Sequence, residues 1–491
     1  MVMVIVITEA AAAAEAHAGT SAGVPVSQVH QGETRAYRKV PPHMAALGAA
    51  AAPALAKAGG HVMNKDRDIT GLPYPERREA LYEPLRKEGI FTWDCMYEEE
   101  YALAGLYTLD RDVLHEMRIA AEALGRVFAK TVNIVSQADE GLLSGLGIPT
   151  AAFDAIRLQH IDSMPSPTVI GRFDFAVNNG QIKMLEFNSD TPTGIVEAFH
   201  VNGAVCQAYG AEDPNAGCSG MLYEAFQAAI KAYGSAQYPL DHIFFSALDW
   251  HEEDAGTTKY LLAQSGLPAS FVPLSQLRVM DERMWVSDDS DHMTPVDVLY
   301  RLHALEKLAE DKDVDGYPTG EHVLRLIAEK KLAVINPPSG FTAQTKALQA
   351  LIWNLHESGQ FYTDEEHEII AAHMLPTYLE NRFSDTSISH VIKPIYGREG
   401  SGVRIVDAAG SVLDENGEDE YLDQPMVYQQ YIELPPVRVE TLKGTTNGRL
   451  LWGCFLIAGK PSAVIARVGG HITNNISYYL PAGLNKGGAK A

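Results

Sequence analysis

The stretch that decides the fold of this 491-residue chain is Gly171-Arg172-Phe173-Asp174-Phe175-Ala176-Val177-Asn178-Asn179-Gly180-Gln181-Ile182-Lys183-Met184-Leu185-Glu186-Phe187-Asn188-Ser189-Asp190, which continues into Thr191-Pro192-Thr193-Gly194. Two alternating segments flank an Asn-Asn-Gly turn, a pattern that predicts an antiparallel hairpin. We expect a three-residue loop at 178–180 with Gly180 in the left-handed conformation. A two-residue loop is disfavoured because it would place Asp174 and Glu186 on opposite faces.

The three-residue loop fixes which side chains of the hairpin share a face. It pairs Arg172 with Glu186, Asp174 with Met184, and Ile170 with Asn188. Residues that pair directly share a face, so the polar face holds Arg172, Asp174, Glu186 and Asn188. The other, mostly apolar face holds Phe173, Phe175, Lys183, Leu185 and Phe187.

One guanidinium, two carboxylates and a carboxamide oxygen suit a magnesium ion that carries phosphate oxygens. The alternative is the solvated outer face of an ordinary amphipathic hairpin. The hydroxyls of Thr191 and Thr193 and the carboxylate of Asp190 at the strand end favour a site.

Composition narrows the class of protein and of partner. The hydrophobic content of 46% is typical of a globular protein, and the length suggests two to four lobes. A net charge of −24 argues against nucleic acid and is compatible with a cationic substrate such as a polyamine, although solubility alone can explain an acidic surface. The four cysteines, which have neither CxxC nor zinc spacing, fit a reducing compartment: Cys95, Cys206, Cys218 and Cys454.

The N-terminal part of the chain predicts neither a membrane anchor nor a folded unit. No apolar run reaches the roughly 18 residues that span a bilayer. Residues 2–7 resemble the core of a secretory signal, but the first basic residue is Arg35, so we expect a cytoplasmic protein. Residues 1–62 are rich in Ala and predict a poorly ordered extension.

Beyond this extension we expect three lobes, at 63–239, 240–343 and 344–491. The first holds the hairpin and helices at 77–87, which Pro84 should kink or shorten, and at 110–129 and 194–209. The second alternates strands with helix and predicts a parallel sheet; its strands are expected at 243–248, 269–274, 296–300 and 332–335, and its helix at 257–265. The third begins with a helix at 344–355 and continues as strands and glycine-rich loops at 388–480.

The third lobe carries features of a nucleotide site. Strand residues 391–395 present Lys393 just before a glycine loop, whose backbone N–H groups can approach phosphate oxygens. This is not a P-loop, because no Gly-Lys-Ser/Thr opens a helix; a hairpin with a glycine turn is the alternative. Lys346 begins a helix, residues 426–435 read as a strand leading into an extended connector, and Arg467 precedes a second glycine loop.

The order of these motifs resembles the glutathionylspermidine synthase family, over about residues 75–480. The motifs that carry the resemblance are Arg172-Phe173-Asp174, residues 186–193, residues 345–353, residues 392–401 and residues 428–435. The resemblance implies an α/β protein with a permuted ATP-grasp fold and a pre-ATP-grasp α/β subdomain. In that topology the metal-ligand hairpin precedes both nucleotide lysines, as it does here.

The resemblance also implies roles for individual residues. Magnesium would be bound by Asp174, Glu186 and Asn188. ATP would be bound by Arg172, Lys346, Lys393, Arg398, Gly400, Ser401, Gln430 and Tyr431. Arg172 and Arg467 would act on the reacting groups, Thr191 and Thr193 on the acid substrate, and Glu252 and Glu253 on the amine. A solvated loop is the alternative for the acidic cluster at 249–254.

The implied activity is an ATP-dependent ligation of a carboxylate and an amine through an acyl phosphate, with release of ADP and phosphate. The expected substrates are a small-molecule or short-peptide acid and an amine. We expect no binding to nucleic acid or to a membrane, and a homodimer is the default expectation for the oligomeric state. Residues 1–62 are too short for the amidase domain of bifunctional members and contain no cysteine, so we expect a stand-alone synthetase. A phosphotransferase and a non-catalytic ATP-grasp binding protein remain as alternatives.

Overall fold

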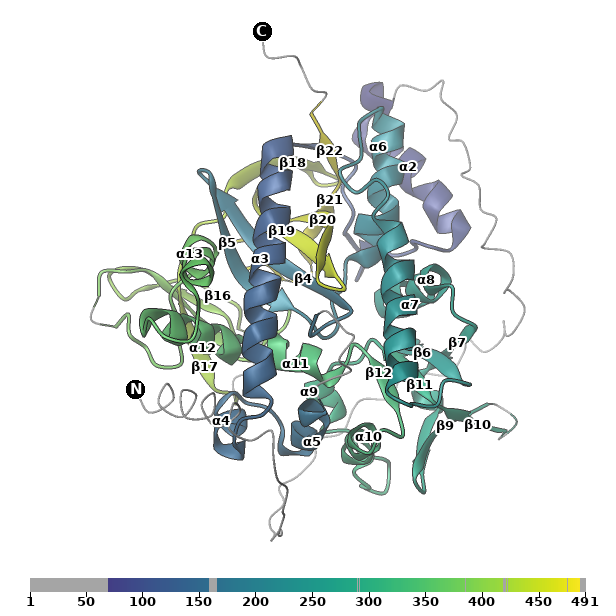
Figure 1. The fold of residues 1–491 in the computed structure, drawn as a ribbon. Helices are drawn as coiled ribbons and strands as arrows, with labels where there is room; N and C mark the ends of the chain where they lie inside the picture. Colours follow the sequence, from purple (N-terminus) through teal and green to yellow (C-terminus); the bar gives the residue numbers. More distant parts are fainter. Residues whose placement is uncertain are drawn as a thin grey trace.

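The computed structural model describes residues 69–158, 166–288, 290, 292–384, 386–417, 421, 423–474 and 476–485. The expected extension at 1–62 lies outside these residues. Figure 1 shows three larger sheets with helices packed around them. Within the described ranges, no helix combines the length and the apolar character needed to cross a membrane.

The central sheet joins two distant segments of the chain. Its strands run in the order β21-β20-β19-β4-β5, and β18 also pairs with β19. These strands are β4 (Ile170–Asn178), β5 (Gln181–Asn188), β18 (Pro436–Thr441), β19 (Gly444–Ile457), β20 (Lys460–Gly469) and β21 (Tyr478–Leu480). Helix α3 (Arg111–Val135) lies across one face of the sheet (Figure 1). There Phe128 packs edge-on against Phe173 and Phe187, with ring centroids 5.6 and 5.1 Å away.

The hairpin β4–β5 forms as expected, but its predicted loop and register are wrong. Asn178 pairs with Gln181, so the loop has two residues, Asn179 and Gly180, both with positive φ. A bulge between Asp174 and Phe175 then shifts the register. As a result Asp174 pairs with Glu186 and Arg172 with Asn188, instead of the predicted pairs.

The bulge explains why the four polar residues still share a face despite the shorter loop. The bulge also makes part of the predicted apolar face wrong. Phe175 pairs with Met184, and Lys183, which was expected on the apolar face, pairs with Ala176. Leu185 packs against Ala176 and Leu451, away from the phenylalanine layer under α3.

A second sheet is wholly parallel, as predicted, and has the strand order β12-β11-β6-β7. Its strands are β6 (Ile243–Ala247), β7 (Ala269–Pro273), β11 (Val298–Arg301) and β12 (Ala333–Ile335). The helices near it are α7 (Ser219–Ser235), α8 (Glu252–Ser265), α9 (Leu305–Leu308) and α10 (Thr319–Ala328). A small antiparallel sheet extends from it, formed by β8 (Leu277–Met280), β9 (Arg283–Ser287) and β10 (Met293–Val296). The neighbouring strands β6 and β11 connect onward to opposite sides, β6 to β7 and β11 to β12, and ligands of such sheets bind at the carboxyl ends beside this point.

The third sheet is antiparallel and has the strand order β13-β17-β14-β15-β16. Its strands are β13 (Thr377–Tyr378), β14 (His390–Pro394), β15 (Arg404–Val406), β16 (Val412–Glu415) and β17 (Met426–Gln430). The helices beside it are α11 (Pro338–Gln344), α12 (Lys346–Glu357) and α13 (Asp364–His373). Lys346 therefore opens a helix and Lys393 lies on a strand, as predicted.

The remaining elements surround these sheets. They are η2 (Ile69–Gly71), α2 (Tyr74–Glu88), β1 (Cys95–Met96), β2 (Glu99–Glu100), β3 (Tyr107–Leu109), α4 (Glu140–Gly145), η3 (Thr150–Ala152), α5 (Phe153–Arg157), the π-helical η4 (Glu197–Val201), α6 (Asn202–Tyr209), η5 (Leu274–Gln276) and β22 (Ala482–Leu484). Helix α2 continues through Pro84 to Glu88, so this residue does not shorten it, and the predicted kink stays a prediction. The limits of the three expected lobes remain predictions, although the central sheet combines strands from the first and the third.

Candidate functional site

The polar face of the β4–β5 hairpin is a connected set of side chains. Arg172 donates to both carboxylate oxygens of Asp174, at 2.7 and 2.9 Å, and to the carbonyl oxygen of Thr193 at 2.6 Å. Asn188 Nδ2 donates to Asp174 Oδ2 at 3.2 Å and lies 3.5 Å from Glu186 Oε1. The expected metal ligands Asp174, Glu186 and Asn188 therefore lie within reach of one another.

The local backbone makes room for the guanidinium of Arg172. Gly453 on the neighbouring strand β19 pairs with Asp174. A Cβ at this glycine would lie 2.8 Å from Arg172 Cδ and 2.6 Å from Ile465 Cγ2. The absence of a side chain at Gly453 thus allows Arg172 to lie flat over the sheet and chelate Asp174.

Two lysines from the third lobe approach this face. Lys346 Nζ lies 3.3 Å from Glu186 Oε2 and donates to the carbonyl oxygen of Gly397 at 2.8 Å. Burial alone would raise the pKa of Glu186, but Lys346, Lys393 and Arg172 outweigh it and lower this pKa to about 2. Glu186 is therefore ionised at neutral pH and available as a cation ligand.

Lys393 is held by a side chain that the sequence analysis did not identify. Its Nζ donates to Gln429 Oε1 at 2.8 Å. Burial lowers the pKa of Lys393 to about 8, because Glu186 only partly offsets the loss of solvation and Lys346 adds repulsion. A polyanion bound at this position would stabilise the charged form of the lysine.

A first cavity, of about 690 Å³, extends from the hairpin to the third sheet. Lys393, Gln430 and Tyr431 line it, as expected for the nucleotide residues. Apolar side chains line the part away from the hairpin, among them Val391, Ile405, Ile432 and Leu434. The cavity thus combines an apolar slot with a cationic end, which is the chemistry of an aromatic base followed by phosphates.

A second cavity, of about 980 Å³, lies on the other side of the hairpin face. Asp174, Glu186 and Gly400 line both cavities. Seven further expected site residues line the second one: Arg172, Asn188, Thr191, Thr193, Glu253, Arg398 and Arg467.

The second cavity is lined by both cationic and acidic side chains. Arg172, Arg398 and Arg467 supply guanidinium groups, and Arg467 is fixed by a 2.7 Å bond to the carbonyl oxygen of Asn474. Glu253 and Glu399 lie in the same lining. The cavity can therefore hold an anionic group and a cationic group at the same time.

Two carboxyl groups in this region have raised pKa values. Burial and the nearby carboxylates of Glu197 and Asp254 together raise the pKa of Glu253 to about 8, against the opposing effect of His251 and Arg467. Burial also raises the pKa of Glu197, which accepts hydrogen bonds from Trp93 and Tyr101. A cation placed here would favour the ionised form of these carboxyls.

Three expected site residues line neither cavity: Lys346, Ser401 and Glu252. Lys346 contacts the hairpin face through Glu186, and Ser401 is buried within the glycine loop. Glu252, at the start of α8, accepts a 2.5 Å hydrogen bond from Thr92 and is exposed, and its contact with the amine stays a prediction. Adjacent residues at a helix start point in different directions, which explains why Glu253 lines the cavity and Glu252 does not.

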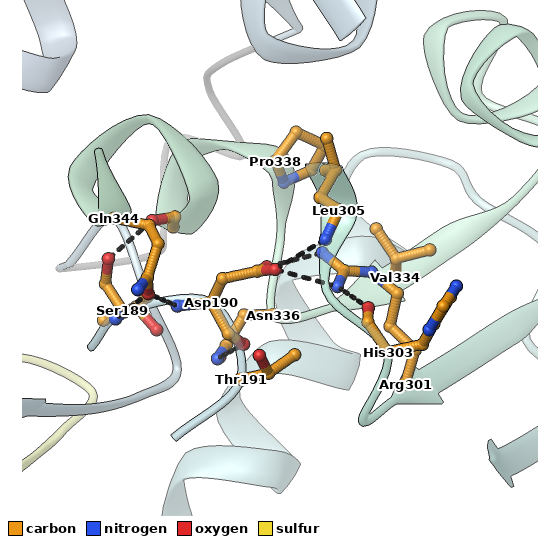
Figure 2. Close-up of polar contacts among 12 residues, drawn as sticks. Ser189, Asp190, Thr191, Arg301, His303, Leu305, Val334, Asn336, Pro338 and Gln344 are labelled. Atoms are coloured by element: carbon orange, nitrogen blue, oxygen red, sulfur yellow. Dashed lines mark hydrogen bonds and ion pairs between the residues drawn. The ribbon is translucent and has the colours of Figure 1, made fainter. Parts of the chain in front are cut away.

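The end of the hairpin is fixed to the parallel sheet by a buried ion pair, shown in Figure 2. Arg301, the last residue of β11, donates to both carboxylate oxygens of Asp190, at 2.6 and 3.1 Å. Leu305 N also donates to Asp190 Oδ2, at 3.0 Å, and Gln344 Oε1 accepts from Ser189 N and Asp190 N. Thr191 follows directly, so this junction determines where its hydroxyl lies.

Asn336 connects both strands of the hairpin to the same junction. Its Oδ1 accepts from Val169 N and Ile170 N, both at 2.9 Å, and its Nδ2 donates to the carbonyl oxygens of Ile170 and Asp190. Asn336 follows β12 and is almost fully buried. A single side chain therefore satisfies four backbone groups at the base of β4 and the end of β5.

The sequence analysis did not identify Arg301, Asn336, Gln344 or Gln429 as functional. Arg301 had a usable signal, since it is a charged residue at the carboxyl end of a buried strand, where ligands of parallel sheets bind. The other three are neutral side chains whose partners are backbone groups or a lysine distant in sequence, and no local pattern indicates such contacts.

The sequence matches one family over most of its length. A sequence model of the family described as glutathionylspermidine synthase preATP-grasp matches residues 75–485. The chain is 28% identical over 282 residues to a protein of Haemophilus influenzae named as an acid–amine ligase, covering 55% of this chain and 64% of that protein. It is 21% identical over 387 residues to the bifunctional glutathionylspermidine synthetase/amidase of Escherichia coli, covering 74% of this chain and 57% of that protein. The chain thus spans less than two thirds of the length of these curated relatives.

A solved structure supports the expected fold class. It is that of a glutathione synthetase-like effector from Globodera pallida in its apo form, which superposes with a TM-score of 0.51 at 13% identity. The superposition covers 86% of this chain and 99% of the effector. Such a distant likeness shows the fold, and it agrees with the predicted α/β architecture of the permuted ATP-grasp type.

Replacement of Arg301 by Met should strongly destabilise the fold. The substitution keeps most of the side-chain volume but leaves the Asp190 carboxylate buried without its charged partner, which typically costs about 3–5 kcal/mol. Urea unfolding measures the effect. Arg438→Met, at an exposed position of β18, is the matched control and should change the free energy of unfolding by less than about 0.5 kcal/mol. Equal effects of the two substitutions would contradict the importance of the buried pair.

Proposed function

The chain belongs to the glutathionylspermidine synthase preATP-grasp family, and we propose that it is an ATP-dependent ligase that joins a carboxylic acid to an amine. One observation carries this proposal. The polar face of the hairpin is the shared wall of two cavities, one with an apolar slot and a lysine, the other lined by both guanidinium and carboxyl groups.

In this proposal ATP occupies the first cavity. The adenine ring would lie among the apolar side chains near Gln430 and Tyr431, and the phosphates would point towards Lys393, Lys346 and the glycine loop. The loop conformation supports this placement, since Gly400 and Gly402 have positive φ and Gly400 lines both cavities. The γ-phosphate would then reach the hairpin face, where both cavities meet.

The donor set of the hairpin fits magnesium. Asp174 and Glu186 pair directly across the strands, and the carboxamide of Asn188 lies beside both carboxylates. Three side chains that carry oxygen atoms are therefore next to one another. Magnesium prefers such oxygen ligands. When bound, the ion would neutralise charge on the β- and γ-phosphates. Arg172 and Lys346, which now contact these carboxylates, would be available to the phosphate oxygens.

The acid and the amine would occupy the second cavity. Thr191, Thr193 and the arginines would hold the carboxylate, and Glu253 would hold the ammonium group. Glu253 is suited to accept a proton from the amine, because burial raises its pKa to about 8, close to the range in which such a transfer is balanced. Glu252, which lies outside the cavity, has no part in this scheme.

The chemistry follows in two steps. A carboxylate oxygen of the acid attacks the γ-phosphorus of ATP, and the bond from this phosphorus to the β,γ-bridging oxygen breaks. ADP departs, and the acid is now an acyl phosphate. The deprotonated amine then attacks the acyl carbon and phosphate departs, which leaves the amide. Arg172 and Arg467 would stabilise the charge that develops on the acyl and phosphoryl oxygens.

Phosphate release from ATP tests the activity. We expect release only when ATP, magnesium, an acid and an amine are all present, with glutathione and spermidine as the first pair to try and other peptide acids and polyamines next. Release with an acid alone would indicate a phosphotransferase or an uncoupled acyl phosphate. Binding of ATP without release in any combination would contradict the ligase proposal and favour a binding protein.

Glu186→Gln should reduce phosphate release at least about 100-fold, because it removes a charged metal ligand while keeping the shape of the side chain. The thermal midpoint should change little, which separates loss of the site from loss of the fold. Glu368→Gln, at an exposed position of α13, is the matched control and should retain full activity. Normal turnover of Glu186→Gln would contradict the metal assignment.

ATP binding should take up a proton near pH 8. The pKa of Lys393 is about 8 in the free protein, and phosphate contact should raise it, so the lysine is already charged below pH 7 and must gain a proton at pH 8–9. Affinity should therefore weaken as the pH rises above 8. Calorimetric titration of ATP in two buffers with different ionisation enthalpies measures the uptake. In Lys393→Arg, whose side chain stays charged, the uptake should disappear; its persistence would assign the proton to another group.

A further inference from the structure

The glycine loop, residues 397–402, is attached to two other parts of the molecule by the side chain of Arg398. Arg398 Nε donates to Glu306 Oε1 at 2.8 Å, and Arg398 Nη1 donates to Thr191 Oγ1 at 2.9 Å. Glu306 belongs to α9, beside the parallel sheet, and its side chain is only 7% exposed. The loop is therefore docked onto α9 and the end of the hairpin, at the edge of the second cavity.

The contact leaves two hydrogen-bonding atoms without partners. Arg398 Nη2 and Glu306 Oε2 are buried, and among the described residues neither has a hydrogen-bond partner. A buried polar atom left unsatisfied destabilises the arrangement that contains it. Arg398 lines the second cavity and its side chain is partly exposed, so its guanidinium is available to an anionic ligand there without displacing Glu306 from Nε.

Glu306 is itself held by the junction at the end of the hairpin. The preceding residue, Leu305, donates its backbone N–H to Asp190 Oδ2, as Figure 2 shows. Thr191, the second partner of Arg398, directly follows Asp190. Glu306 and Thr191, which both accept hydrogen bonds from Arg398, are therefore each next in sequence to a residue of the Asp190 junction. The distance between them depends on this junction.

The loop also contains backbone conformations that need support. Glu399 has φ of 53° although it is not glycine, and Gly400 follows with φ of 74°. A non-glycine residue in this region is strained, and ordering a loop loses conformational entropy. The contacts of Arg398 and the 2.8 Å bond from Lys346 to Gly397 offset part of these costs.

We propose that Glu306 is a positioning residue, which docks the glycine loop through Arg398 and so presents the guanidinium of Arg398 to the anionic group of the acid substrate. The docking holds whatever the chain catalyses. The presentation to an acid rests on the proposed ligase function. The two parts are therefore tested separately.

Limited proteolysis with trypsin tests the docking without reference to activity. Trypsin must accommodate the arginine side chain in its specificity pocket, so cleavage after Arg398 should be slow while Glu306 and Thr191 hold it. In Glu306→Ala cleavage at this bond should be at least about 10-fold faster, with other cleavage sites unchanged. Glu310→Ala, an exposed acidic position just beyond α9, should behave as wild type. Equal cleavage rates in folded Glu306→Ala and wild type would overturn the proposal.

Steady-state kinetics test the presentation of Arg398. Glu306→Gln, which keeps the side-chain shape and a weaker acceptor, should raise the KM for the acid about 10-fold and leave the KM for ATP within twofold. In an Arg398→Ala background, Glu306→Gln should have almost no further effect, because its action passes through the arginine. Additive losses, or equal changes in both KM values, would overturn the role. If the wild-type protein ligates nothing, the proposed function fails while the proteolysis result still decides the docking.

Discussion

The buried carboxylate of Asp190 is the constraint on which the site depends. It ends the hairpin that carries the polar face, and it is held by Arg301, by the N–H of Leu305 and, through its own backbone, by Gln344 and Asn336. An ionised group this deeply buried is tolerated only when it is fully paired. The parallel sheet therefore cannot move relative to the hairpin without exposing an unpaired charge, and the second cavity between them keeps its shape.

Charge balance in the site explains how it can remain folded without a ligand. Arg172 pairs with Asp174, and Lys346 pairs with Glu186. The cationic side chains that would contact a polyphosphate are therefore paired with the carboxylates that would bind a metal ion. Entry of a magnesium–phosphate complex would exchange one set of ion pairs for another and would not create new buried charge. Lys393 is the exception, since its lowered pKa shows that its charge is incompletely compensated before binding.

The sequence predicted the composition of the site better than its geometry. Alternation in residues 170–188 was enough to group Arg172, Asp174, Glu186 and Asn188, but the loop and register were wrong because a two-residue turn and a bulge compensate for each other. A bulge has no local signature here, since Leu185 reads as one more apolar strand residue. Glu253 and Glu252 could not be separated for a similar reason, because the exact start of α8 decides which of them faces the cavity. Arg301 and Asn336 were missed because their partners lie more than a hundred residues away and form only in the fold.

The two cavities meet at Asp174 and Glu186, and this limits where a group can pass between their ligands. Any atom that bridges the cavities must lie over the hairpin face, beneath Gly400 of the glycine loop, which lines both. Leu451 and Thr473 also line both cavities. The position of the glycine loop helps to determine whether water reaches that point, and Arg398 holds this loop to Glu306 and Thr191. Exclusion of water, which an acyl phosphate requires, would then depend on contacts made in the parallel sheet's lobe rather than on the nucleotide alone.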